Sequence, residues 1–130
     1  MAIENTPTLE PFKAESDLSG SQYRIVVLGT NDGEVDLPAA TTDTPLGVVY
    51  DFVKGTAGES VTIATGGVAK CEANAAITKG AMVGIAATTG RIGAKTTAGD
   101  WIIGQAREAA TAQGDIIAVK LAPVPFKYHG

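Results

Sequence analysis

The amino-acid sequence predicts a mainly β protein, built as one small barrel or sandwich. The apolar fraction is 45% but aromatic residues contribute only 5%, so aliphatic side chains and alanine have to fill the core. Sixteen glycines divide the chain, and charged residues make up only 18% of it. This composition is typical of many turns and short strands rather than of a helical bundle. A chain of 130 residues normally forms one domain with one core.

Residues 1–21 are predicted to form an extended N-terminal arm. They contain two prolines, which fix φ and remove amide donors, and they show no sustained apolar period. A disordered tail is the alternative for this stretch. Ile3, Leu9 and Phe12 favour an arm that becomes ordered on a partner.

The β-rich domain is expected over residues 22–122, and its first half is a series of short strands. The run YRIVVLG returns through the turn TNDGE as EVDLP, which predicts a hairpin. A strand VVYDF follows at 48–52. The segment SVTIATGG alternates as a half-buried strand. VAKCEA is expected to pair with it across Gly66 and Gly67, with Cys71 beside alanines on the packed face.

The second half of this domain is predicted to contain further strands. AMVGIA and RIGAKT form a hairpin around the turn ATTG, and GDWIIGQA and GDIIAVKLA are two more strands. Residues 106–112 between them are too few for a stable helix and are expected to form a wide connection or an extended strand end. Residues 123–130, PVPFKYHG, are expected to form an extended C-terminal tail.

The side chains needed for catalysis or for a metal site are scarce, so neither an enzyme nor a cofactor is predicted. The one histidine, His129, is the penultimate residue, and the one cysteine, Cys71, is expected on a packed strand face. A catalytic pair of the two is therefore not expected. Asp32, Glu34 and Asp36 fall on one face of a hairpin and lack the loop that wraps a calcium ion.

A carrier domain is a further reading of the segment AITKGAMVGI. The KG turn at Lys79 resembles a turn of biotinyl and lipoyl carrier domains, in which the modified lysine lies at the tip of the next hairpin. That tip is AATTG here, residues 86–90, and it has no lysine. Lys79 itself precedes a turn glycine, where a solvated charge is expected. The segment is therefore interpreted as scaffold, and a small hydrolase or carrier is the weakest reading of the chain.

The charge pattern indicates neither a nucleic-acid partner nor a membrane partner. The formal net charge is -4 and the basic residues form no cluster, whereas direct binding to nucleic acid needs concentrated positive charge. No run of 18 apolar residues occurs and the N-terminus lacks the pattern of a signal peptide.

Four motifs follow one another along residues 22–122, namely LGVVYDF, GGVAKCEA, AITKGAMVGIAATTGRI and IIGQAREAATAQGDIIAVKL. Their order resembles that of the capsid decoration (cement) proteins of tailed bacteriophages, including the lambda-type head decoration proteins. The resemblance implies a β-tulip or β-clip-like fold and a homotrimer. It also implies a non-enzymatic protein on the outer surface of the virion capsid, assembled in the host cytoplasm, with the major capsid protein as its partner.

The role implied by this resemblance is to stabilise the shell by clamping neighbouring major capsid protein subunits. An extended arm can pair with an exposed sheet edge and insert apolar side chains into shallow pockets. Candidate residues of such a capsid-binding arm are Ile3, Pro7, Leu9, Pro11 and Phe12. We expect deletion of residues 1–14 to leave the barrel folded and to lower occupancy on heads.

A carbohydrate-binding adhesion module or head-fibre module on the virion surface is the alternative function. Trp101, Tyr23 and Tyr50 are its candidate residues, because aromatic rings stack on sugars. Each of the three aromatic side chains also fits a place in the core.

Overall fold

A computed structural model describes residues 7–50 and 56–129, and every regular element in these residues is a β-strand. The strands form one sheet in the order β1-β3-β2-β4-β5-β9-β8-β6-β7. The prediction of a mainly β fold is confirmed. The strands are β1 (Thr8–Ala14), β2 (Ile25–Leu28), β3 (Glu34–Asp36), β4 (Gly47–Val49), β5 (Ser60–Glu72), β6 (Met82–Ile85), β7 (Ile92–Ala94), β8 (Trp101–Ala106) and β9 (Ile116–Lys127).

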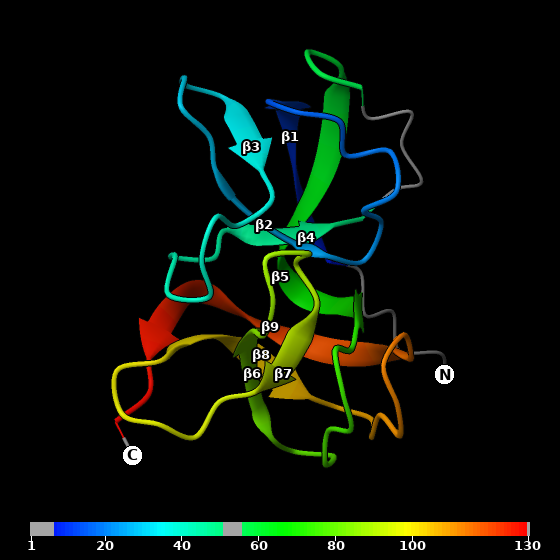
Figure 1. Ribbon diagram of the computed structural model, residues 1–130, viewed down its shortest axis with the longest axis vertical. Coiled ribbons are helices and arrows are strands. Elements are labelled where there is room, and N and C mark those ends of the chain that lie inside the picture. The colour runs from blue at the N-terminus through cyan, green and yellow to red at the C-terminus, as the bar shows by residue number, and fades with distance from the viewer. Residues whose placement is uncertain (1–6, 51–55, 130) are drawn as a thin grey trace.

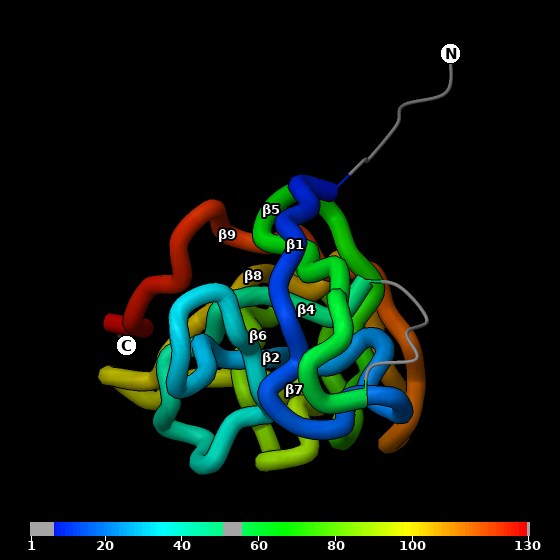
Figure 2. The backbone as a smooth tube through the Cα atoms, turned by 90° about the horizontal axis from the view of Figure 1, so that it is seen from above, coloured from blue at the N-terminus to red at the C-terminus, as the bar shows by residue number. Residues whose placement is uncertain are grey.

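The upper half of the molecule is a closed barrel of β1, β3, β2, β4 and the first part of β5 (Figure 1). It closes because β1 pairs on one side with β3, in parallel, and on the other with β5, antiparallel. Viewed from above, β1 runs beside β5 as part of the barrel wall (Figure 2). Small and branched apolar side chains fill this upper barrel, as the composition predicts; they are Ala14, Leu18, Val26, Val35, Val49, Val61 and Ile63.

The lower half is a sheet of the second part of β5 with β9, β8, β6 and β7. An isolated bridge between Ala73 and Ile92 brings its two edges together. The core of this lower sheet contains Cys71, Val83, Ile85, Ile103, Ile117 and Val119, among others. The connection over residues 106–112 is not helical, in agreement with the prediction, and Ala110 forms a bridge with Ile77.

Strand β5 links the two halves, and here one prediction was wrong. Gly66 and Gly67 do not form a hairpin turn; β5 runs through them as a single strand of 13 residues. Gly66 pairs with Thr8 in the barrel, whereas Gly67 pairs with Leu121 in the lower sheet. Gly67 has a φ of 72°, which lets the strand change direction between these partners. The predicted packed face of Ala69 and Cys71 is confirmed.

The structure places both predicted end segments within this sheet. Of the predicted arm, residues 7–21 are described; they include all of β1, and Ala14 and Leu18 are fully buried in the upper barrel. Of the predicted tail, residues 123–127 form the end of β9, and Phe126 and Lys127 pair with Ile102 and Trp101 at the start of β8. Residues 8–14 and 123–127 are extended strand segments of the protein's own sheet, whereas residues 15–21 form bends and turns that bury Leu18.

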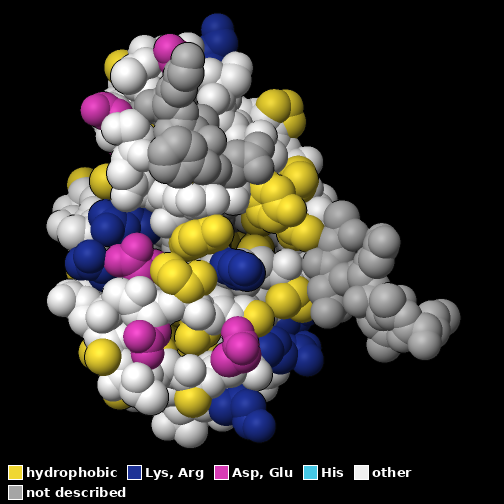
Figure 3. Space-filling model, turned by 90° about the vertical axis from the view of Figure 1, so that its right-hand side faces the viewer, with side chains coloured by type: hydrophobic (Ala, Val, Ile, Leu, Met, Phe, Trp, Pro, Cys, Tyr) yellow, Lys and Arg dark blue, Asp and Glu magenta, His cyan; other side chains and the backbone are white. Residues whose placement is uncertain are grey.

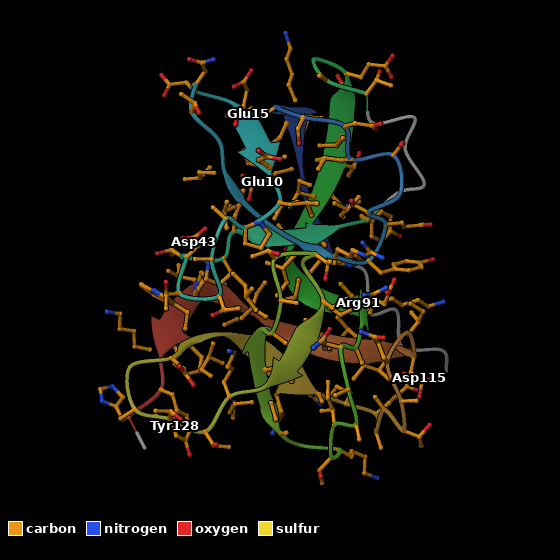
Figure 4. All side chains as sticks on the ribbon, viewed as in Figure 1. Glu10, Glu15, Asp43, Arg91, Asp115 and Tyr128 are labelled. Atoms are coloured by element: carbon orange, nitrogen blue, oxygen red, sulfur yellow. The ribbon has the colours of Figure 1, made fainter. Side chains whose placement is uncertain are left out.

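The two halves are also joined at the turn between β6 and β7. The backbone amide of Ile25 donates a hydrogen bond of 2.7 Å to the carbonyl of Gly90. Beside this contact, the Glu72 carboxylate accepts from Arg91 and lies 3.4 Å from Arg24 Nη2. Figure 4 shows Arg91 at this junction. The ion pairs connect the start of β2, the end of β5 and the start of β7, and therefore fix the barrel against the lower sheet.

Candidate functional site

The structure does not assemble Cys71 and His129 into a reactive pair. Cys71 is completely buried in the core of the lower sheet, and burial raises the pKa of its thiol to about 12. The thiol is therefore protonated at neutral pH, which is the unreactive form of cysteine. His129 is exposed near the end of the chain. Lys79 is exposed at its turn and lines none of the hollows described below.

The acidic hairpin residues have ordinary hydrogen-bond partners. Glu34 Oε1 accepts a hydrogen bond of 3.1 Å from Asn31 Nδ2, and Asp36 Oδ1 accepts one of 2.8 Å from the backbone amide of Leu37. Asp32 is exposed in the turn. Over residues 7–50 and 56–129, no group of three His, Cys, Asp or Glu side chains is placed to hold a metal ion.

One edge of β1 is free along most of its length, which makes it the first candidate surface. The Lys13 amide donates to the Gly33 carbonyl on the β3 side, whereas the Ala14 amide donates to the Glu59 carbonyl on the opposite side. Because amides alternate along a strand, Leu9 and Pro11 direct their backbone groups to the β3 side. Strand β3 pairs only with Lys13 and Ala14, so it leaves that edge unpaired over residues 8–12.

The side chains of β1 divide into an outer and an inner set. Leu9 is 40% exposed and Pro11 is also exposed, so both face outward. Phe12 is half-buried and packs against the core of the upper barrel. Pro7 stands before the strand and lines the hollow described next. Ile3 lies outside the described residues.

A hollow of about 440 Å³ lies at the waist, where the upper barrel meets the lower sheet. We call it the waist hollow; it is lined by Pro7, Tyr23, Val48, Val49, Tyr50, Val68, Ala69, Lys70 and Ala118. Apolar side chains predominate in the lining, and Lys70 is the one charged residue among the described residues that form it. Figure 3 shows hydrophobic side chains gathered across the middle of this face of the molecule.

The waist hollow contains two of the three predicted stacking residues. Tyr23 has a φ of 69°, the one positive φ of a residue other than glycine in the described ranges. Two backbone hydrogen bonds hold it there, because its amide donates to Val49 over 2.9 Å and its carbonyl accepts from Glu72 over 2.8 Å. Trp101 lies elsewhere, with Lys127 Nζ 5.2 Å from its ring centroid.

A second candidate surface, which the sequence analysis missed, is an apolar ridge formed by Leu28, Val124 and Phe126. Their exposed fractions are 64%, 75% and 44%. Pro125 and Leu28 line one hollow beside the ridge, together with Asp43, and Phe126 lines another with Lys120. The PVPF sequence was the available signal, because its apolar residues alternate with prolines that suit the edge of a sheet.

Pro125, between Val124 and Phe126 of the ridge, directs its backbone to the unpaired side of β9. The Tyr128 amide donates to Asp100 over 2.7 Å, and the Tyr128 carbonyl accepts from Gly99 over 2.8 Å, so the backbone of Tyr128 faces the β8 side. By alternation, Pro125 directs its nitrogen to the opposite, unpaired side. Figure 4 shows Asp43 and Tyr128 on the same side of the molecule, the left-hand side in that view. Pro125 offers no amide donor to an added strand, so contacts here rely mainly on side chains.

Comparison with protein families gives one match, to the phage cement protein model, and it covers residues 18–121. The chain belongs to the phage cement protein family. No curated protein matches this cement protein. Among solved structures it is similar to the crystal structure of the head fiber gp8.5 N base of bacteriophage phi29, with a TM-score of 0.66 and 16% sequence identity over 95% of this chain and 100% of that chain.

Family membership gives the cement protein a capsid decoration role at the virion surface, as a structural phage protein. The match begins at Leu18 and ends at Leu121, so β1 and the exposed end of β9 both lie outside it. The structural similarity covers 95% of the chain and shows a shared fold. In the ranges that the structure describes, no helix is long and apolar enough to cross a membrane.

Proposed function

We propose that this cement protein binds the outer surface of the phage head through β1 and clamps neighbouring major capsid protein subunits. The observation that carries the proposal is the free edge of β1 over residues 8–12, with Leu9 exposed beside it. Family membership supplies the capsid as the partner. Assembly of the virion in the host cytoplasm belongs to the same proposal.

The β1 edge is suited to hold an extended segment of the capsid protein. The Leu9 amide and carbonyl are available for a backbone ladder, and the Leu9 side chain adds an apolar contact. Pro11 has no amide donor, which limits the ladder to the first part of the strand. The proposed contact surface is therefore Ile3, Pro7, Leu9 and Pro11, and Phe12 holds β1 to the barrel. Because many copies bind one shell, a modest affinity at each contact can be sufficient to hold the protein on the head.

The β1 contact can be tested with the variant Leu9→Asp. We expect it to fold as the wild type does, because Leu9 faces outward, and to bind purified expanded heads lacking the cement protein about tenfold more weakly. Cosedimentation with such heads gives the affinity. Thr96→Asp is the control, because it adds the same charge at an exposed residue far from β1 in the sequence. Equal binding of Leu9→Asp and the control would contradict the role of β1, and a wild-type protein that does not bind heads would contradict the function.

We further propose that the homotrimer forms through the apolar ridge. The hollow on one side of the ridge contains Asp43 and the hollow on the other side contains Lys120, so the two hollows carry opposite charges. The ridge of one copy therefore fits beside a hollow of the next copy. When each copy contacts the next through two different surface patches, the copies form a closed ring if the rotation between neighbouring copies adds up to a full turn. Removing exposed apolar area of this kind from water supplies the driving force.

The variant Val124→Asp tests this self-association. We expect it to shift the cement protein from trimer to monomer in sedimentation velocity, because a buried carboxylate without a partner opposes the contact. Ile116→Asp is the matched control, since Ile116 is an exposed aliphatic residue at the other end of β9. A wild-type monomer, or a trimer that persists in Val124→Asp, would contradict the ridge as the interface.

A carbohydrate-binding module remains the second candidate function. The observation in its favour is that Tyr23 and Tyr50 share the waist hollow. Against it, the other lining residues are aliphatic apart from Lys70, whereas a sugar needs several hydrogen-bonding groups. Binding of the wild-type protein to a glycan array, lost in Tyr50→Ala, would favour this candidate.

A further inference from the structure

We propose that the waist hollow is a second docking site for the major capsid protein, and that it takes an extended apolar segment with a carboxylate. The proposal rests on the proposed function, because it takes the capsid as the partner. It adds a site at the waist, next to the start of β1, together with the chemistry of the segment that fills it.

The lining of the waist hollow selects for an apolar occupant. Valine, alanine and proline side chains form most of its wall, and two tyrosine rings complete it. Tyr50 is 39% exposed, so its ring has surface left to cover. Aromatic rings of this kind pack well against the flat apolar sides of extended peptides, and prolines in particular. The chain's own Pro7 already packs at the edge of the hollow.

The backbone at Tyr23 is a second and independent sign of a binding site. A φ of 69° places a bulky side chain in a region that costs roughly 1 kcal/mol or more. Strain of this kind persists only where the surroundings impose it, and here the hydrogen bonds to Val49 and Glu72 do so. The strained backbone presents Tyr23 to the hollow beside Tyr50. Such outliers cluster at functional sites, so this strain favours a ligand-binding role over simple packing.

The charge of the hollow indicates a carboxylate on the occupant. Lys70 is exposed, and it forms neither of the ion pairs in the described part of the chain, both of which involve Glu72. An acidic group on the partner would therefore meet an ammonium group that forms no ion pair with the residues that the structure describes. The gain is larger than at an open surface because the hollow excludes part of the surrounding water.

The waist hollow is also continuous with the proposed β1 contact. Pro7 lines the hollow, and β1 begins at the next residue, Thr8. An extended segment of the capsid protein with its apolar and acidic side chains in the hollow would therefore lie beside the start of β1. This continuity favours the capsid protein over a sugar, which would use the hollow alone.

The test compares two charge reversals and one truncation for binding to purified expanded heads lacking the cement protein. We expect Lys70→Glu to lower the affinity at least about tenfold at low salt, and Tyr50→Ala to lower it by a similar factor. Lys79→Glu is the matched control, since it makes the same charge change at an exposed lysine outside the hollow. Thermal melting of each variant identifies any loss of folding. The binding of Lys70→Glu should also depend less on salt than that of the wild type.

The outcomes separate this inference from the proposed function. If the wild type does not bind heads, the proposed function fails. If the wild type binds and Lys70→Glu matches Lys79→Glu, the function stands and the docking site is refuted. A change in the sedimentation of Tyr50→Ala would assign the hollow to a second copy of the chain. Binding of the wild type to a glycan array that is lost in Tyr50→Ala would assign the hollow to a sugar. Either result would overturn the proposal.

Discussion

Replacing Gly90 by alanine is expected to lower the free energy of unfolding of the cement protein by more than about 2 kcal/mol. Gly90 has a φ of 83°, and a Cβ on it would lie 2.6 Å from the Ile25 carbonyl oxygen and 2.9 Å from Arg24 Cβ. The Gly90 carbonyl accepts the hydrogen bond from Ile25 that joins the two halves. The turn would have to move away from β2, so this variant loses the contact as well as adopting a strained backbone.

Gly80→Ala is the control that separates these two effects. Gly80 has a similar φ of 92°, but a Cβ on it would meet nothing within 4 Å. It should therefore cost only the backbone strain, about 1 kcal/mol. Urea unfolding followed by circular dichroism gives both values. Equal losses in the two variants would show that the contact between the turn and β2 does not hold the two halves together.

The sequence predicted those parts of the fold that depend on local pattern. The hairpins around TNDGE and ATTG are confirmed as the pairs β2–β3 and β6–β7, because a turn and two alternating runs are visible within about ten residues. The buried face of Cys71 is confirmed because alternation along a single strand is also a local pattern. Gly66 and Gly67 show the limit of local pattern. A pair of glycines also permits a bend within one strand, and the distant partners β1 and β9 decide which of the two forms.

The candidate site was less predictable, because it depends on long-range contacts. Leu9 and Pro11 were predicted as residues of a capsid-binding arm, and nothing near them in the sequence indicates pairing with β5 some fifty residues later. The waist hollow joins residues from β4, β5 and β9, which no local pattern brings together. Tyr23 was considered only as a stacking or core residue, since its positive φ leaves no trace in the residue type.

Deletion of residues 1–14 is now expected to unfold the upper barrel, in contrast to the expectation from the sequence. The deletion removes β1, which pairs with β5 over Thr8–Lys13 and with β3 at Lys13 and Ala14. Loss of this ladder and of the apolar contacts of Phe12 should cost at least about 3 kcal/mol. That is a large share of the roughly 5–15 kcal/mol that stabilises a typical domain.

Truncation of residues 1–6 is the matched comparison, because it leaves all of β1 in place. The two truncations can be compared by thermal melting and by amide hydrogen exchange of β5, whose first part should lose protection only in the longer deletion. Lower occupancy of the longer deletion on heads would then result from loss of the barrel rather than from loss of an arm. The Leu9→Asp variant, in contrast, keeps the barrel and changes only the outer edge of β1. An unchanged melting temperature after deletion of residues 1–14 would show instead that β1 rests on a barrel stable without it, and that the edge of β5 can be left open.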